Sequence, residues 1–371
     1  MANRSVLELL AEATRLRASP RRLGLTEYID FQLFRGDVPW ELKREFGGVR
    51  AQIAAQEMLV DDYSRFLSLD KVTMYVILKG FGFPVPRVRA IYRSCRPSSQ
   101  LRLESDEALL AYLQEAGNLP VYIKPAYGGF GRGNVLVSGF DGTHLSLGNG
   151  TRQTPIDFAR LLDDPHPLGW MLQEPLTSHY AITQLTGSPK ISGLRIHTVF
   201  KRHASAIHKV IWKINAGERD FDNFHNGRSG NMLAAVDPQT GVVIRAISGV
   251  GLKQSEITVH PKTGSTLLGF QIPFWPEVVN LVNDAQRAFP GFICPGWDIA
   301  LCDDGPKILE VNAFGDVDLA QYAYRRSFFE GELMQALQER GLAHLLDHAR
   351  GRRTRSPVNH RLGIRRHHWP W

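Results

Sequence analysis

Gly296–Asn312 reads Gly-Trp-Asp-Ile-Ala-Leu-Cys-Asp-Asp-Gly-Pro-Lys-Ile-Leu-Glu-Val-Asn, two short apolar runs around an Asp-Asp-Gly-Pro cluster. Glycine supplies the positive φ angle that a tight hairpin loop requires, so this pattern predicts strand, turn, strand. A turn centred on Asp304 sets Asp298 directly opposite Glu310. Because side chains alternate along a strand, Asp298, Glu310 and Asn312 then share one face. The opposite face is apolar and is expected to point into the core: Ile299, Leu301, Leu309 and Val311.

The polar face of this hairpin predicts a metal site. Two carboxylates and an amide side by side repel one another unless a cation lies between them. A few hard oxygen ligands suit Mg²⁺, which keeps its other positions for water and phosphates. The alternative is the polar outer face of a half-exposed hairpin.

Composition describes a globular chain with a basic end. Its 371 residues, 43% of them hydrophobic, are enough for two or three domains. The formal net charge is +7, but seven arginines and no acid lie in residues 350–371, so the body has 37 basic and 37 acidic residues. We therefore expect no nucleic-acid binding by the body. The tail, residues 347–371, either contacts an anionic membrane lipid, polymer or nucleic acid, or is a flexible segment or cloning remnant.

Cysteine content and hydropathy favour the cytoplasm. The three cysteines show no metal-binding spacing, and their odd number argues against a disulfide framework. We find neither a signal-peptide core nor an apolar run of the roughly 20 residues that a membrane span requires.

Helical spacing dominates the first part of the chain. Residues 1–65 are expected to form helices that pack on the main body or shape a substrate entrance. Lys71 then precedes a short apolar helix over Val72–Leu78, and a strand follows over Val88–Tyr92. Ser105–Ala116 has the spacing of an amphipathic helix.

Val121–Val137 is a glycine-rich stretch between two strand-like runs. The first run ends at Lys124, and four glycines follow: Gly128, Gly129, Gly131 and Gly133. Glycines let the backbone approach an anion closely, and Lys124 adds a mobile positive charge, so the stretch predicts a hairpin that covers phosphates. A Walker loop and a dinucleotide fingerprint both need a helix after the glycines, whereas a strand follows here. A flexible surface turn is the alternative.

Further strands and loops complete the pattern. Trp170–Pro175 has the features of a strand that ends in a bend, and Leu194–Phe200 alternates so that Arg195 and His197 share a face. Solvated strand faces explain most such polar residues, but the guanidinium fork of Arg195 matches phosphate and carboxylate oxygens. The next predicted elements are a strand over Ala206–Ile214, a polar loop over 220–231, a hairpin over 235–244, and helices over Pro276–Phe289 and about 319–346.

The order of these signals resembles the ATP-grasp superfamily, including relatives of D-alanine:D-alanine ligase. The resemblance covers roughly residues 71–321. His225-Asn226-Gly227, His260–Gly264, Gln271–Trp275 and the hairpin motifs Gly296–Leu301 and Gly305–Asn312 resemble the sugar-transfer-associated ATP-grasp family. This resemblance implies an α+β, ATP-grasp fold in which two α+β subdomains grip ATP. We expect a helical extension over 1–65, an N-subdomain over 66–175 and a C-subdomain over 176–346.

The resemblance also implies roles for individual residues. Lys71 and Lys124 would hold the α- and β-phosphates of ATP, under the hairpin that contains Gly128, Gly129, Phe130 and Gly131. Adenine would lie at Gln173, Glu174 and Leu176. Arg195 and Lys124 would be catalytic, Arg195 facing the γ-phosphate, and Asp298, Glu310 and Asn312 would bind Mg²⁺. The candidate substrate contacts are His197, Asn223, His225, Asn226, Gly227 and Arg228.

Two departures from the family pattern concern the nucleotide and the acceptor. No acid lies between Glu174 and Glu218 to hold the ribose, so either Ser178, His179 or Tyr180 would take that role or the ribose would be held loosely. Gly227-Arg228 stands where a glycine pair is expected.

The function implied is that of a carboxylate–amine ligase. A carboxylate would attack the γ-phosphate of Mg-ATP, and an amine would attack the acyl-phosphate, in the biosynthesis of a surface polysaccharide or peptide conjugate. Small-molecule or peptide acids and amines would be substrates, and a glycan-assembly or carrier protein a possible partner. The alternatives are a kinase with the same ATP site and a non-catalytic nucleotide-binding scaffold for glycan assembly.

Overall fold

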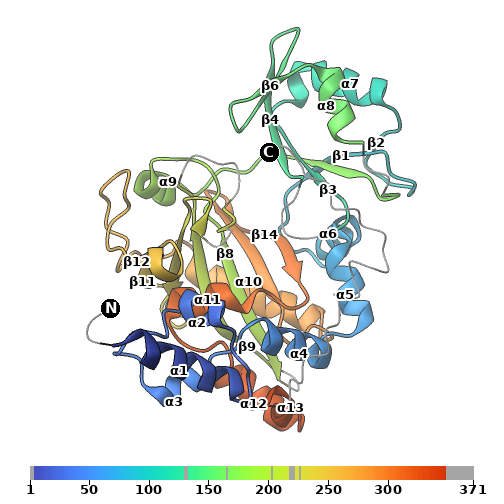
Figure 1. Ribbon diagram of the computed structural model, residues 1–371. Helices are drawn as coiled ribbons and strands as arrows, with labels where there is room; N and C mark the ends of the chain where they lie inside the picture. The colour runs from blue at the N-terminus through green and yellow to red at the C-terminus, as the bar shows by residue number, and fades with distance from the viewer. Residues whose placement is uncertain are drawn as a thin grey trace.

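Two seven-stranded sheets form the framework of the protein. The computed structural model describes residues 4–128, 133–163, 166–201, 204–216, 222–224 and 227–347. Figure 1 shows a smaller lobe above a larger one, each built around one sheet. The strands of the first sheet all lie between Val88 and Gln173, and those of the second between Leu194 and Asn312.

The small lobe is a sheet with helices on one face. Its strand order is β2-β1-β7-β3-β4-β5-β6, with all described neighbours antiparallel except β1 and β2. Helices α7 and α8 share one core with the sheet. The elements are β1 Val88–Tyr92, β2 Leu101–Leu103, α7 Asp106–Gln114, β3 Val121–Pro125, β4 Val135–Phe140, β5 Leu145–Leu147, β6 Arg152–Gln153, α8 Pro155–Leu161 and β7 Trp170–Gln173.

The large lobe has helices on both faces of its sheet. The strand order is β12-β11-β10-β9-β8-β13-β14, antiparallel throughout. One face packs against α10, and the other against α11, α12 and the N-terminal helices. The elements are α9 Tyr180–Thr186, β8 Leu194–Lys201, β9 Ala204–Ile214, β10 Met232–Val236, β11 Val243–Ser248, β12 Ser255–Glu256, α10 Trp275–Ala288, β13 Gly296–Cys302, β14 Gly305–Asn312, α11 Val317–Tyr324, α12 Gly331–Glu339 and α13 Ala343–Asp347.

Helix α10 illustrates why the sequence folds in this way. Pro276 lies in its first turn, where the missing N–H costs nothing. Its buried residues recur every three or four positions and form one apolar stripe that covers the sheet. These residues are Trp275, Val278, Leu281, Val282 and Ala285.

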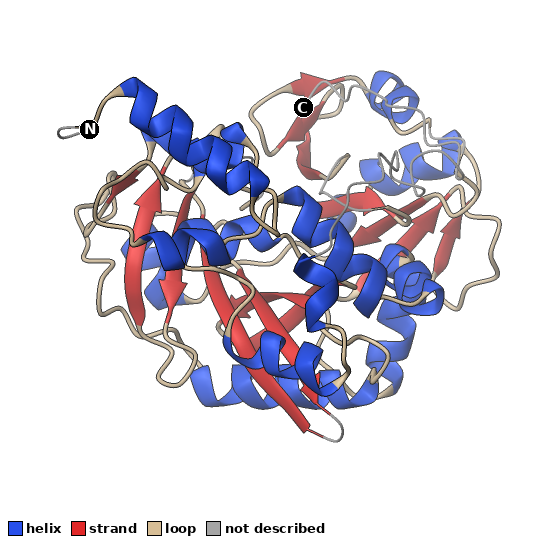
Figure 2. Ribbon diagram, turned by 60° about the horizontal axis from the view of Figure 1, so that its bottom comes forward, coloured by secondary structure: helices blue, strands red, loops and turns tan. Residues whose placement is uncertain are grey.

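The N-terminal helices are part of the core of the large lobe. Phe46 is fully buried in the core between the large sheet and helices α11 and α12. Gln321 of α11 exchanges two hydrogen bonds with the backbone of Gly47. Figures 1 and 2 show the first of these helices on the large lobe, far from the small one, whereas Figure 1 shows the last two beside the small lobe. They are α1 Val6–Ala18, α2 Leu25–Asp30, α3 Trp40–Glu45, α4 Val49–Leu59, α5 Asp62–Leu69 and α6 Lys71–Gly80.

The hairpin β13–β14 has the predicted strands and one unpredicted bulge. Asp298 pairs with Glu310, as expected for a turn centred on Asp304. Nearer the turn the register shifts by one residue, so Ile299 pairs with Ile308 instead of Leu309. Leu309 is the surplus residue of this β-bulge. The expectation that Leu309 points into the core was therefore wrong: Ile308 is fully buried there instead.

The remaining predictions of secondary structure differ mainly at element ends. The helix expected over Ser105–Ala116 ends at Gln114, and the helical region near 319–346 consists of α11, α12 and α13. Helices α8 and α9 and the short strands β2, β5, β6 and β12 were not predicted. In the described part of the chain, every helix is too short or too polar to span a lipid bilayer. The subdomain limits at residues 66, 176 and 347 remain predictions.

Candidate functional site

The start of α6 is joined directly to the glycine-rich segment of the small lobe. The backbone N–H of Lys71 donates to Ala126 (2.9 Å), and that of Gly128 donates to Leu69 (3.0 Å). The ammonium group of Lys71 also donates to the carbonyl of Gly128. The predicted phosphate lysine therefore lies against the first glycine of the predicted phosphate hairpin.

A buried carboxylate fixes this helix start. Asp70 is fully buried, and its side chain accepts hydrogen bonds from the backbone (3.1 Å) and hydroxyl (2.8 Å) of Thr73. Arg96, from the segment between β1 and β2, forms an ion pair with the same carboxylate. Asp70 is thus both the N-cap of α6 and a contact to the small lobe.

Lys124 lies at the end of β3, between the two sheets. It is buried, and its Nζ donates to the hydroxyl of Tyr75 on α6 (3.0 Å). Burial lowers the pKa of Lys124 to about 7. The positive charge of Lys71 lowers this pKa further, whereas the negative charge of Glu310 partly raises it. The charges of Glu310 and Lys71 therefore converge on Lys124 from the two lobes.

Arg195 and Asp298 form a buried, two-pronged ion pair between neighbouring strands. Arg195 Nε and Nη2 lie 2.6 and 3.0 Å from the two carboxylate oxygens of Asp298. Lys213 of β9 lies 3.5 Å from the same carboxylate and 3.1 Å from Asp222. Burial alone would raise the pKa of Asp298, but the two cations outweigh it and lower that pKa to about 2. Asp298 is therefore ionised at neutral pH.

The predicted metal ligands differ in how free their oxygens are. Asp298 engages both oxygens with Arg195, although an ionised carboxylate keeps further lone pairs. The amide nitrogen of Asn312 donates to Gly296 (3.4 Å), which directs its hydrogen-bonding nitrogen away from any metal and leaves the oxygen as a ligand. The carboxylate of Glu310 is half-buried beside them. This donor set fits Mg²⁺ by its chemistry. Among the described residues, no group of three or more His, Cys, Asp and Glu side chains is positioned to hold a metal ion.

His197 lies beneath the candidate site. Its ring is fully buried, and neither ring nitrogen has a hydrogen-bond partner among the described residues. Burial lowers its pKa well below the usual value, and the charge of Arg195 adds to this effect. A Cβ atom on Gly315 would lie 2.4 Å from the ring, so Gly315 covers it closely. In this conformation His197 does not reach an open surface, and its substrate contact remains a prediction.

The sequence matches one protein family over most of its length. The match is to the family described as sugar-transfer associated ATP-grasp, over residues 57–336 of 371. The chain belongs to this family. It is an α+β protein with the ATP-grasp fold. A search of curated protein sequences finds no significant match.

Several solved structures resemble the chain at low sequence identity. The L-amino acid ligase from Bacillus licheniformis is 14% identical, with a TM-score of 0.40, over 73% of this chain and 48% of that one. For N5-carboxyaminoimidazole ribonucleotide synthetase from Thermotoga maritima, these values are 12%, 0.39, 73% and 49%. For D-alanine-D-alanine ligase from Helicobacter pylori, they are 12%, 0.40, 75% and 61%. The chain thus spans about half the length of the first two proteins.

The predicted hinge of this ATP-grasp chain lies at the end of β7. Gln173 is buried there, and its side-chain oxygen has no hydrogen-bond partner among the described residues. The side chain of Glu174 accepts from the backbone of Arg87 (2.9 Å), which ties the segment to β1. His179 accepts a hydrogen bond from Ala181 (3.1 Å) and caps α9. Its predicted contact with ribose, like the adenine contact of Leu176, remains a prediction.

The other predicted contacts fall on loops, some outside the described residues. Gly129, Phe130, Gly131, His225 and Asn226 lie outside them. Among the rest, Gly227 adopts a positive φ of 75°, and Asn223 accepts a hydrogen bond from Asn231 through its backbone. The substrate roles of Asn223, Gly227 and Arg228 remain predictions.

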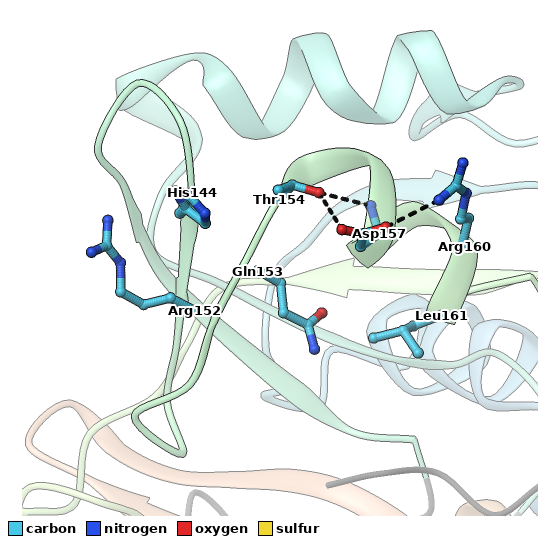
Figure 3. A pocket seen from close by; sticks show the side chains of 7 residues that line it. All are labelled: His144, Arg152, Gln153, Thr154, Asp157, Arg160 and Leu161. Carbon is cyan, nitrogen blue, oxygen red and sulfur yellow. Dashed lines mark hydrogen bonds and ion pairs between the residues drawn. The ribbon is translucent and has the colours of Figure 1, made fainter.

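An open cavity of about 570 Å³ lies at the other end of the small sheet. Strand β6 is the edge strand of that sheet, and β4 and β5 separate it from Lys124 on β3. Figure 3 shows Asp157 hydrogen-bonded to both Thr154 and Arg160, so these three side chains satisfy one another. Its seven lining residues are His144, Arg152, Gln153, Thr154, Asp157, Arg160 and Leu161.

Three residues of the ATP-grasp site were not predicted as functional. Tyr75 could have been found from its position four residues after Lys71, which sets both on one face of α6. Lys213 and Asp222 were visible only as a strand lysine and a loop acid. No sequence spacing indicates that they meet at Asp298.

Proposed function

We propose that the protein is an ATP-dependent carboxylate–amine ligase that forms an amide or peptide bond through an acyl-phosphate. We further propose that it acts in the cytoplasm, in the biosynthesis of a surface polysaccharide or peptide conjugate. One observation carries the proposal: Lys71 and the buried Lys124 meet at the start of α6, which Tyr75 bonds to the hairpin that carries Asp298 and Glu310. This arrangement suits a bound nucleoside triphosphate. The two lysines would contact its phosphates, and the two carboxylates would bind the Mg²⁺ that accompanies them.

The nucleotide would bind along the small lobe. Lys71 and Lys124 would hold the α- and β-phosphates, beneath the hairpin that begins at Gly128. Adenine would lie against the segment from Gln173 to Leu176. The buried, unpartnered oxygen of Gln173 supports this assignment, because a purine amino group could donate to it.

Glu310, Asn312 and the remaining lone pairs of Asp298 would hold Mg²⁺, which when bound offsets the negative charge of the phosphates. Arg195 would face the γ-phosphate. Because Asp298 already holds one edge of its guanidinium group through two nitrogens, Arg195 would need little reorganisation when a phosphate arrives.

The reaction would consist of two displacements. A carboxylate oxygen of the first substrate attacks the γ-phosphorus, and the bond to ADP breaks. The nitrogen of the amine substrate then attacks the acyl carbon, phosphate leaves, and the amine gives up a proton. The chain supplies position and charge rather than a covalent nucleophile. A glycan-assembly or carrier protein would supply the substrates or receive the product. The basic tail would contact an anionic partner.

Calorimetric titration of Mg-ATP tests the nucleotide site. Glu310→Gln removes one negative charge and keeps the shape, so we expect at least tenfold weaker Mg-dependent binding. Asp304→Asn, in the exposed turn of the same hairpin, is the matched control and should bind as the wild type does. If a folded wild type binds no Mg-ATP, the ligase and the kinase alternatives both fail, and what is left is a non-catalytic scaffold that works without this nucleotide.

Product mass then separates a ligase from a kinase. Wild-type protein, Mg-ATP and pools of acids and amines should yield a condensed product of acid plus amine minus water, together with ADP. A product heavier than one substrate by a phosphoryl group would instead establish a kinase.

A further inference from the structure

The hydroxyl of Tyr75 joins the small lobe to the edge strand of the large lobe. It accepts a hydrogen bond from Lys124 Nζ (3.0 Å) and donates one to the carbonyl of Leu309 (2.7 Å). Tyr75 is 4% exposed, and Lys124 Nζ also lies over its ring, 4.8 Å from the centroid. One side chain on α6 thus contacts the lysine through both its hydroxyl and its aromatic face.

The carbonyl that receives this hydrogen bond belongs to the bulge residue. Leu309 is the extra residue between the pairs Asp298–Glu310 and Ile299–Ile308. Strand β14 is the outermost of the described strands of its sheet, so its outer backbone groups have no neighbouring strand to bind within the described part of the chain. Tyr75 satisfies one of these groups, and Pro84 satisfies another by accepting from the N–H of Ile308 (2.9 Å).

Loss of the hydroxyl would leave the buried ammonium group of Lys124 and the carbonyl of the half-buried Leu309 without this partner. An ammonium group that loses an acceptor inside a protein is destabilised more strongly than a neutral donor would be. The alkyl chain of Lys124 has many rotamers, and the hydrogen bond and the ring together restrict them. The contact therefore sets where the positive charge lies.

We propose that Tyr75 is a positioning residue that holds Lys124 Nζ in place for the phosphates and anchors it to the bulge of β14. The inference rests on the proposed function, since it assigns to Lys124 the binding of nucleotide phosphates. Lys71 and Tyr75 lie four residues apart, so α6 presents a phosphate ligand and the positioning group for a second one on the same face.

A double-mutant cycle tests this role. Tyr75→Phe keeps the ring and removes the hydroxyl, so we expect Mg-ATP binding to weaken about tenfold. In the Lys124→Met background the same change should weaken binding less than about twofold, because there is no ammonium group left to position. Competition with a fluorescent nucleotide up to millimolar concentration keeps the weakened variants measurable. Tyr75→Met is a second hydroxyl-free variant, should the phenylalanine variant not fold.

Tyr324 offers a matched control within the same molecule. Its buried hydroxyl also bonds to backbone carbonyls, those of Val210 (2.9 Å) and Val236 (2.5 Å), and Lys209 Nζ also lies 4.8 Å from its ring centroid. Tyr324→Phe should lower the melting temperature about as much as Tyr75→Phe does, yet leave Mg-ATP affinity unchanged.

The possible outcomes distinguish a failure of the proposed function from a failure of the positioning role of Tyr75. A wild type that binds no Mg-ATP would overturn the proposed function and, with it, this inference. If the wild type binds and Tyr75→Phe binds equally well, the positioning role alone is wrong. It is also wrong if Tyr75→Phe weakens binding by the same factor with and without Lys124. Only an effect that depends on Lys124 supports it.

Discussion

The ion pair between Arg195 and Asp298 bears both on the stability of the fold and on the chemistry of the candidate site. Both side chains are largely buried, and the attraction between them offsets the cost of removing two charges from water. Lys213 lies 3.5 Å from the same carboxylate and 3.1 Å from Asp222, so two cations and two carboxylates balance one another in this cluster. The balance lets four charges stay buried together.

A second buried acid, Asp318 of α11, gives a pH dependence that can be measured. Burial raises its pKa to about 7, and the charges of Asp316, Glu27 and Asp30 add to the effect. An aspartate in an unfolded chain has a pKa of about 4. The folded state therefore binds this proton more tightly, and the free energy of unfolding should fall as the pH rises from about 4 to about 7, then stay level.

Asp318→Asn imitates the protonated acid and should remove this dependence. At pH 8 we expect the variant to be more stable than the wild type by about 1–2 kcal/mol, and near pH 4 the two should be equal. Urea unfolding at both pH values measures the difference. Asp62→Asn, at an exposed position of α5, is the control. A stability difference that is the same at both pH values would contradict the assignment.

Among the elements, the turn after β14 packs tightly on the candidate site. A Cβ atom on Gly315 would lie 2.4 Å from the ring of His197 and 3.2 Å from Arg195 Nη1. Real Cβ contacts are not this short, so Gly315→Ala has to displace one of these side chains. The turn can therefore be altered to move the guanidinium group without changing Arg195 itself.

Gly315→Ala should lower both stability and Mg-ATP affinity. Overpacking of this kind costs about 1–3 kcal/mol, and we expect Mg-ATP binding to weaken by several-fold because Arg195 moves. Gly36→Ala is the matched control, since no atom lies within 4 Å of its added Cβ. Chemical denaturation and calorimetry of the two variants provide the comparison. Unchanged affinity in a destabilised Gly315→Ala would show that the turn does not position Arg195.

The same elements show how far the sequence allows prediction. The pairing of Asp298 with Glu310 follows from strand alternation and one turn, so it was predictable and is confirmed. The bulge at Leu309 was not, because an extra residue in a strand leaves no mark in the alternation until the partner strand is known. The contact between Arg195 and Asp298 depends on β8 lying next to β13, and about 100 residues separate those strands.

At the scale of the whole molecule, the boundary of the family match does not coincide with a boundary of the fold. The match begins at residue 57, yet ten fully or nearly fully buried apolar residues of the large-lobe core precede it. The ten core residues are Ala13, Leu16, Leu23, Tyr28, Phe31, Leu33, Val38, Phe46, Ala51 and Ala55. Gln32 also donates to the backbone of Gly251 (2.9 Å), far along the chain.

A chain that begins at residue 57 should therefore not fold independently. We expect it to bind a hydrophobic dye and to lack a cooperative melting transition. In the full chain, Phe46→Ala should lower the free energy of unfolding by about 3–5 kcal/mol, while Leu7→Ala, at a position 79% exposed, should change it by less than about 0.5 kcal/mol. A truncated chain with a sharp transition near that of the full protein would show that the N-terminal helices are separable.

Helix α6 belongs to both lobes at once. Its Met74 and Leu78 pack in the core of the large lobe, while the backbone N–H of Lys71 is bonded to Ala126 of the small lobe. A change of the angle between the lobes would therefore strain either the packing of Met74 and Leu78 or the hydrogen bond between Lys71 and Ala126. The start of α6 thus couples the position of Lys71 to the relative placement of the two sheets.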